Sequence, residues 1–277
     1  MTPLERGPHS RIFIPLLVAV LGISIGVGGV VALRPLEPTS AARPTASAAA
    51  EERPADQSAA LARPLSNRAV YARVEPSVVD VTAALRSSDE TASGTGFIIY
   101  LGAVYVLTNN HVIRDAISVT VTIPATGRTY QARIVGTDTS TDIAVLQASS
   151  LPVLTAATLG DSARVAVGSA VVAIGNRAGA GGLPALAPGV ISGIGTTIEA
   201  SDGASKFTET LHGLLATTAR IVPGDSGGPL ADAAGAVIGV DTAAGTGGAE
   251  PGYAIPIDAA IAAVRQILVH AHAHLGI

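Results

Sequence analysis

Three polar residues in separate loops have the types needed for nucleophilic attack on a carbonyl group. Ser226 lies in the glycine-flanked stretch Pro223–Leu230, between two apolar runs. A serine hydroxyl is a weak nucleophile, so it needs a base and a residue that orients that base. Upstream, His111 follows a pair of asparagines, and Asp142 comes directly before an apolar run. The sequence therefore offers a candidate nucleophile, base and orienting carboxylate.

Each of these residues has a defined role in such a mechanism. His111 would take the proton of the Ser226 hydroxyl, and Asp142 would fix the tautomer of the imidazole. The backbone N–H groups of Gly224 and Ser226 would hold the oxyanion that forms. Singly, each residue is explained as well by an ordinary turn. Together they occur in three separate turns and in a chain order that produces one known geometry, which favours the catalytic interpretation.

Composition excludes several other classes of function. The chain has 277 residues, of which 48% are hydrophobic and only 3% aromatic, so we expect a core of Val, Ile, Leu and Ala. A net charge of −4 gives no electrostatic reason to expect nucleic-acid binding. The absence of cysteine excludes disulfides and cysteine-ligated metals. No cofactor or metal is expected.

An uncharged apolar segment near the N-terminus predicts a membrane anchor. Residues 12–33 would span about 33 Å as a helix, enough for the hydrocarbon core of a bilayer. Arg6 and Arg11 precede it, which favours a cytoplasmic location for residues 1–11. The alternative is a cleaved signal, cut after a small residue such as Ala32. Residues 34–67 are rich in Ala, Pro and Ser and predict a disordered linker.

From about Arg68 the pattern predicts an all-β domain that extends to residue 277. Short β-branched runs alternate with turn signals, which favours barrels over α/β units. The runs fall into two sets, which predict barrels over about 70–155 and 160–257. Asp258 is expected to cap a closing helix over about 258–274 that packs on the second barrel. The predicted strands are 77–82, 95–100, 104–108, 117–123, 132–136, 143–147, 170–174, 189–194, 214–218, 236–241 and 252–255.

Several motifs in unbroken order resemble the chymotrypsin-fold serine proteases of the bacterial HtrA/Deg type. They cover roughly residues 70–257. The resemblance implies two Greek-key six-stranded barrels of the trypsin-like type and a serine endopeptidase that acts on proteins or peptides. It also implies catalytic roles for His111, Asp142 and Ser226. The matching stretches are 94–99, 107–113, 138–146, 159–162, 173–176, 189–192, 224–230 and 252–256.

The chain departs from the family pattern in two ways. We expect no PDZ domain, although the family usually has one or two. The residue before the nucleophile is Asp225, where the family usually has Asn. A buried unpaired carboxylate is costly, so we expect an internal arginine to pair with it, with Arg177 the first candidate and Arg220 the second. The alternative is that Asp225 faces solvent or accepts only backbone hydrogen bonds.

By the same resemblance, substrate binding falls to residues just before the nucleophile loop and to the strand after Gly239. These positions are Ile221, Thr242, Ala243 and Ala244. They are small or apolar, which predicts cleavage after small or medium aliphatic residues. Arg220 lies nearby in the sequence and could narrow this pocket or favour an acidic residue. His270 and His274 have the spacing of a ligand pair, but a solvated helix end is the better interpretation.

The leading hypothesis is a single-pass protein of the bacterial cell membrane with its protease domain outside the cytoplasm. The alternatives are a binding or chaperone module without turnover, and an esterase that uses the same three residues. The oligomeric state is not predicted.

Overall fold

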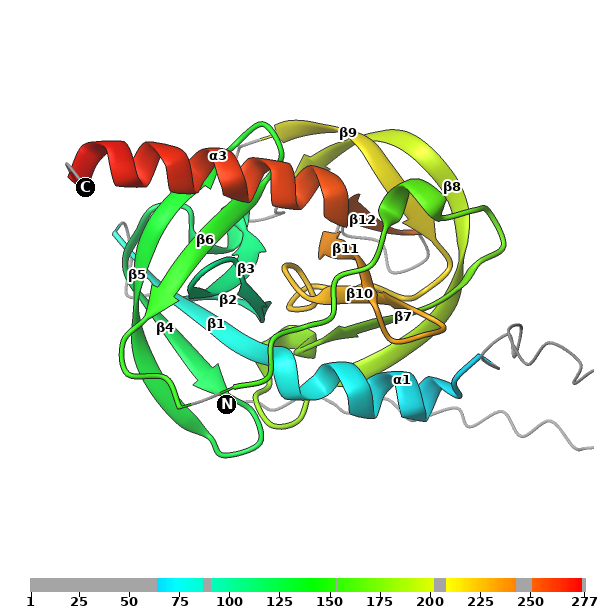
Figure 1. Cartoon of the computed structure of the whole chain (residues 1–277), viewed down its shortest axis with the longest axis horizontal. Helices are drawn as coiled ribbons and strands as arrows, with labels where there is room; N and C mark the ends of the chain where they lie inside the picture. Colours follow the sequence, from blue (N-terminus) through cyan, green and yellow to red (C-terminus); the bar gives the residue numbers. More distant parts are fainter. Residues whose placement is uncertain (1–63, 87–90, 153, 202–207, 243–250, 276–277) are drawn as a thin grey trace, which may run out of the picture. The chain divides into compact units, whose positions relative to one another are not determined.

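Twelve strands form two closed antiparallel barrels in the part of the chain that the structure describes (Figure 1). The structure is a computed structural model, and it describes residues 64–86, 91–152, 154–201, 208–242 and 251–275. The predicted membrane segment and almost all of the predicted linker lie outside these residues. No helix within them is both long enough and apolar enough to cross a bilayer.

The first barrel has the strand order β1-β2-β3-β6-β5-β4. Alternate residues of each strand point inward, so one face of every strand supplies an aliphatic interior that includes Val81, Ile98, Val106 and Leu146. The strands are β1 (Val78–Leu85), β2 (Thr91–Tyr100), β3 (Val104–Asn109), β4 (Ala116–Ile123), β5 (Arg128–Asp138) and β6 (Ile143–Ala148).

The second barrel has the order β10-β11-β12-β9-β8-β7, which is the same pattern. Its interior includes Ala173, Ile191, Leu215 and Ile238. The strands are β7 (Ala170–Gly175), β8 (Ala185–Ser201), β9 (Thr208–Thr217), β10 (Pro229–Asp232), β11 (Val237–Thr242) and β12 (Gly252–Pro256). The predicted all-β, two-barrel class is confirmed.

Strand β10 and helix α1 (Asn67–Val74) are among the elements absent from the sequence-based prediction. Strand β10 has four residues and begins with proline, so it gives too weak a periodic signal to be recognised. Helix α1 lies where the linker was predicted to end. The Ser66 side chain accepts a hydrogen bond from the Ala69 N–H at 3.3 Å, and Val70 and Val74 are buried. The helix is therefore part of the folded domain.

Helix α3 (Ile257–Leu275) packs on the second barrel, as predicted, and also contacts strands of the first. At 1.5 Å per residue its 19 residues are about 28 Å long, enough to cover both. Asp258 lies inside the first turn and does not cap it. Its carboxylate accepts hydrogen bonds from the Ser162 hydroxyl at 2.7 Å and the Ala163 N–H at 3.2 Å. The carboxylate is thus used by the short 3₁₀ helix η2 (Ser162–Arg164).

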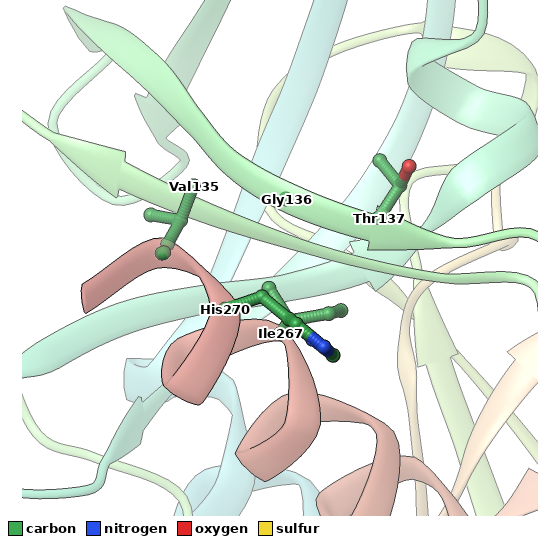
Figure 2. Close-up of a pocket in the computed structure, with 6 residues that line it drawn as sticks. Val135, Gly136, Thr137, Ile267 and His270 are labelled. Atoms are coloured by element: carbon green, nitrogen blue, oxygen red, sulfur yellow. The ribbon is translucent and has the colours of Figure 1, made fainter. Parts of the chain in front are cut away.

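An open hollow lies between α3 and β5 (Figure 2). It has a volume of about 290 Å³ and is lined in part by Val135, Thr137, Ile267 and His270. None of the predicted catalytic residues lines it, so it takes no part in the chemistry argued below.

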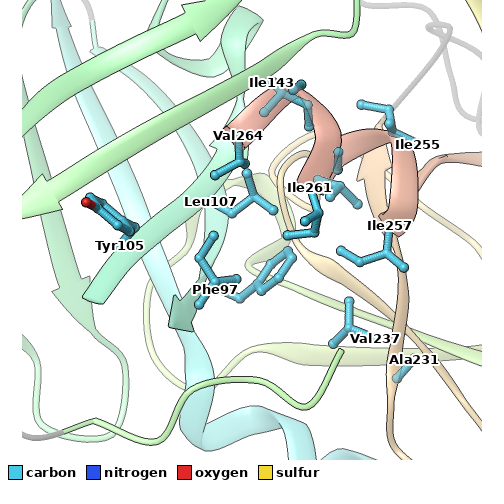
Figure 3. Packing of buried hydrophobic residues seen from close by; sticks show 14 of the residues in the cluster. Phe97, Tyr105, Leu107, Ile143, Ala231, Val237, Ile255, Ile257, Ile261 and Val264 are labelled. Atoms are coloured by element: carbon cyan, nitrogen blue, oxygen red, sulfur yellow. The ribbon is translucent and has the colours of Figure 1, made fainter. Parts of the chain in front are cut away.

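A continuous apolar cluster joins the two barrels to α3 (Figure 3). Phe97 and Leu107 enter it from the first barrel, Val237 from the second, and Ile261 and Val264 from the helix. All five are at most 8% exposed. Burial of apolar surface stabilises a fold by roughly 25 cal/mol per Å². The cluster therefore stabilises one arrangement of the two barrels. That arrangement sets the positions of the loops that carry the candidate site.

Candidate active site

The structure brings His111 and Asp142 into direct contact. His111 lies in the short helix α2 (Asn110–Ile113), directly after β3, and Asp142 lies directly before β6. The His111 Nδ1 lies 2.7 Å from the Asp142 Oδ2, and the His111 backbone N–H donates to Oδ1 at 2.9 Å. Asp142 is 1% exposed. Both carboxylate oxygens thus contact the same histidine, which fixes the orientation of its ring.

The two asparagines before His111 hold Asp142 in an uncommon backbone conformation. Asp142 has a φ of 54°, in the left-handed region that few non-glycine residues adopt. Its carbonyl accepts hydrogen bonds from the Asn110 N–H at 3.1 Å and the Asn109 side-chain amide at 2.9 Å. These bonds compensate for the backbone cost and aim the carboxylate at the imidazole.

The loop that carries Ser226 lies between β9 and β10, and short backbone hydrogen bonds within it fix its conformation. The Asp225 N–H donates to the Val222 carbonyl, and the Gly228 N–H donates to the Asp225 carbonyl, both at 2.9 Å. Gly227 has a φ of 85°, and a Cβ there would collide with the Thr95 carbonyl and the Thr108 hydroxyl. Only glycine fits at this point, because both the conformation and the space exclude a side chain.

Thr95 of the first barrel binds the Ser226 loop of the second. Its hydroxyl donates to the Gly224 carbonyl at 2.6 Å, and its backbone N–H donates to the Ser226 carbonyl at 2.8 Å. The same hydroxyl accepts the Asn176 N–H at 2.9 Å. Thr95 is 0% exposed, so water does not compete for these bonds. The carbonyls on either side of Asp225 are therefore held in fixed directions.

Gly94 places the Ser226 loop against the helix that carries His111. A Cβ on Gly94 would lie 2.7 Å from both methyl carbons of Val112 and 3.0 Å from the Ser226 carbonyl oxygen. The residue that follows His111 and the backbone of Ser226 are thus separated by little more than a glycine. The three predicted catalytic residues accordingly come from neighbouring parts of the fold.

Asp225 is buried and lies within ion-pair distance of an arginine. Its Oδ2 accepts the Val222 N–H at 3.0 Å and lies 3.8 Å from the Arg177 Nε. Burial raises the pKa of the Asp225 carboxyl, and the Val222 N–H and the Arg177 charge oppose that rise. The first of the two predicted arginines is therefore in place, in the 3₁₀ helix η3 (Arg177–Gly179), whereas Arg220 is exposed. Asp225 does not face solvent, but among the described residues its carboxylate accepts a hydrogen bond only from the Val222 backbone, and Arg177 lies beyond hydrogen-bond distance.

The predicted substrate-binding residues are only partly described. Ile221 is half-buried, and its side chain lies over Gly252, where a Cβ would be 2.8 Å from the Ile221 Cδ1. Thr242 is 1% exposed at the end of β11. Ala243 and Ala244 lie outside the described residues.

Sequence reasoning missed the residues that support the site. Thr95, Asn109 and Asn176 each take part in a hydrogen bond described above. All three residues lie in motifs already recognised, but a motif does not state which contacts its members make. No cluster of three or more His, Asp or Glu side chains within the described ranges could hold a metal ion.

Comparison with known proteins identifies the family. The trypsin-like peptidase domain family matches residues 94–240, just over half of the chain. The serine protease Do-like HtrB of Bacillus subtilis is 33% identical over 274 residues, which cover 91% of this chain and 58% of that protein. The putative serine protease HhoA of Synechocystis is 41% identical over 171 residues, with 60% and 41% covered.

Other relatives agree with this assignment. The periplasmic pH-dependent serine endoprotease DegQ of Escherichia coli is 35% identical over 178 residues, covering 63% of this chain and 37% of that protein. The chain thus spans between 37% and 58% of the length of these three relatives. A solved structure of the HtrA-type protease AlgWS227A with a tripeptide superposes with a TM-score of 0.64 at 33% identity, over 74% of this chain and 64% of that one. The chain therefore belongs to the trypsin-like peptidase family and is similar to its HtrA-type serine proteases.

Proposed function

We propose that this protein is a serine endopeptidase that hydrolyses peptide bonds through His111, Asp142 and Ser226. The observation that carries the proposal is the His111–Asp142 pair, in which one buried carboxylate uses both oxygens on one histidine beside the Ser226 loop. An arrangement that only stabilised a turn would not need the ring as well as the backbone. The relatives' names as serine proteases support the same activity.

The proposed reaction runs in two halves. The Ser226 Oγ attacks the peptide carbonyl while His111 takes its proton, and Asp142 stabilises the imidazolium that results. The N–H groups of Gly224 and Ser226 stabilise the oxyanion, at about 3 kcal/mol for each donor. His111 then gives the proton to the leaving amine. A water molecule, activated by the same histidine, hydrolyses the acyl-enzyme and restores the Ser226 hydroxyl.

The substrate side is proposed to favour small or medium aliphatic residues at the position before the cleaved bond. Ile221 lies over Gly252, so this part of the wall is apolar. An apolar wall offers no charge to bind Lys or Arg. A peptide-library profile dominated by basic or large aromatic residues at that position would refute this preference.

The protein is further proposed to act outside the cytoplasm, tethered by residues 12–33. The relatives named as periplasmic proteases support the location. The tether rests on the sequence alone. Protease protection of the catalytic domain in intact spheroplasts would contradict the location outside the cytoplasm, whereas digestion by added protease would support it.

Labelling with a fluorophosphonate probe tests the activity directly. The wild-type protein should be labelled, and Ser226→Ala should not, while both keep the same melting temperature. Ser118→Ala, which changes an exposed serine on β4, is the matched control and should label like the wild type. Absence of labelling in a folded wild-type protein would favour the alternative, a binding or chaperone module that is silent or latent.

A further inference from the structure

A completely buried carboxyl group lies next to the Ser226 loop. Asp241 is in β11 and is 0% exposed. Its backbone accepts one hydrogen bond from the loop and donates another to it. The Gly227 N–H donates to the Asp241 carbonyl at 2.8 Å, and the Asp241 N–H donates to the Gly228 carbonyl at 2.7 Å. The Asp241 side chain therefore starts from a backbone position that is fixed relative to the loop.

The environment of Asp241 disfavours its ionised form. Neither carboxyl oxygen has a hydrogen-bond partner in the described part of the chain. Burial raises the pKa of Asp241 well above its usual range, and the negative charge of Asp225 raises it further. The Ile174 backbone amide favours the charged form, but it does not reach hydrogen-bonding geometry, so burial dominates. A charged carboxylate without partners would cost several kcal/mol here.

Asp225 is the carboxylate that would accept a hydrogen bond from Asp241. Its Oδ2 accepts the Val222 N–H, but its buried Oδ1 has no partner within the same described residues. A protonated carboxyl group has one O–H donor, which is the group that Oδ1 lacks. Two neighbouring buried carboxylates do not both ionise readily, and one proton between them removes the repulsion.

We propose that Asp241 is a positioning residue that retains its proton at neutral pH and donates it to the Asp225 Oδ1. This bond, together with Val222 and Arg177, holds the Asp225 side chain. Because Gly224 and Ser226 flank Asp225, it also holds the two amides assigned to the oxyanion. The effect on the reaction of Ser226 rests on the proposed function, whereas the proton on Asp241 does not.

The other charged groups near β11 do not replace this proton. Asp232 accepts the Ala234 and Ala236 N–H groups of its own turn, at 2.8 and 2.9 Å. Asp258 is bonded to Ser162, and Arg265 is exposed. The titratable or charged side chains described on the elements packed against β11 include Asp225 and Arg177 at the loop, Asp232 on β10, Tyr253 on β12, Tyr105 on β3, and Asp258, Arg265 and the exposed His270 on α3.

Infrared spectroscopy tests the proton itself. At about pH 8 ordinary carboxyl groups are ionised. The wild-type protein should still show the carbonyl stretch of one protonated carboxylic acid, and Asp241→Asn should lack it. Asp232→Asn, which changes an aspartate on the neighbouring strand, is the matched control and should retain the band. A wild type without the band, or a band that survives Asp241→Asn, would overturn the proposal.

Fluorophosphonate labelling at about pH 8 tests the positioning role. Asp241→Asn keeps a neutral donor, so it should label within about threefold of the wild type. Asp241→Leu lacks the donor and should label at least about tenfold more slowly.

The two measurements separate the possible failures. Equal losses in Asp241→Asn and Asp241→Leu would exclude the positioning role. If the folded wild type is not labelled at all, the proposed function fails, and the infrared band still decides whether Asp241 carries the proton.

Discussion

The hydroxyl of Thr95 donates to the carbonyl of Gly224 at 2.6 Å, so a strand of the first barrel holds the Ser226 loop of the second. This contact is buried and joins residues 129 positions apart. His111 and Asp142 also come from the first barrel. Thr95 therefore fixes the loop relative to the two residues with which Ser226 is proposed to work.

Replacement of Thr95 by valine should slow the reaction of Ser226. The change is close to isosteric, but it leaves the Gly224 carbonyl and the Asn176 N–H without their partner, at about 1–3 kcal/mol each. We expect kcat to fall at least tenfold, since the loop then takes more than one arrangement. Thr95→Ser keeps the hydroxyl and should retain most of the activity. Steady-state kinetics on a peptide substrate make the comparison.

The control for this prediction is Thr120→Val, which changes a half-buried threonine on β4 whose hydroxyl makes only a 3.5 Å contact. It should leave kcat unchanged. If Thr95→Val and Thr95→Ser behave alike, the hydroxyl has no part in holding the loop.

Replacement of Asp142 by asparagine should remove most of the catalysis and leave the fold intact. The asparagine side chain can still accept the His111 backbone N–H, so α2 keeps its place. It cannot fix the ring in the tautomer that accepts the serine proton, and kcat should fall by about 10⁴-fold. KM should change little, because Asp142 does not touch the substrate.

Asp115→Asn is the matched control, because Asp115 also has a positive φ, 59°, and is exposed. Asparagine tolerates that conformation, so activity should be unchanged. A loss of less than tenfold in Asp142→Asn would show that the carboxylate does not assist His111.

Replacement of Arg177 by alanine should weaken the Ser226 loop without unfolding the protein. The Arg177 side chain is 39% exposed and its Nε lies 3.8 Å from Asp225, so solvent screens the pair and its loss should cost no more than about 1 kcal/mol. Labelling should nevertheless slow by about three- to tenfold, since the pKa of Asp225 rises when the Arg177 charge is removed.

Arg220→Ala tests the other predicted arginine. Arg220 is exposed, so its removal should leave the labelling rate unchanged and act only on the choice of substrate residue. Unchanged labelling and stability in Arg177→Ala would show that Asp225 does not depend on that charge.

The fold was largely predictable because its signals are local. Alternating apolar residues mark most strands, and their grouping indicated two barrels. Strand β10 gave no such signal, since it is short and begins with Pro229. The cap on α3 was predicted wrongly because Asp258 has a stronger partner in Ser162, 96 positions away. Local propensity contains no information about such a partner.

The site was predictable only in its chemical types. The serine, histidine and aspartate could be recognised because few residue types can act as nucleophile, base and orienting carboxylate. Thr95 and Asp241 were not singled out, because a threonine and an aspartate in strands have many uses. Their roles depend on groups that the barrels bring close, and only the folded arrangement shows which groups those are.

Asp80 should make the protein less stable as the pH rises through the weakly acidic range. It is a buried residue of β1, and burial raises the pKa of its carboxyl to about 6, although a hydrogen bond from the Asn176 side chain opposes the rise. In the unfolded chain the pKa is near 3.8. Between these values the folded state binds more protons than the unfolded state, so the free energy of unfolding falls as pH increases.

Asp80→Asn removes this dependence because asparagine does not ionise. The variant should match the wild type near pH 4 and exceed its free energy of unfolding near pH 7.5, by no more than about 3 kcal/mol. Urea denaturation at a series of pH values measures both curves. Asp161→Asn, at an exposed position, should follow the wild type. Parallel curves for the wild type and Asp80→Asn would mean that Asp80 ionises in the folded protein as readily as in the unfolded chain.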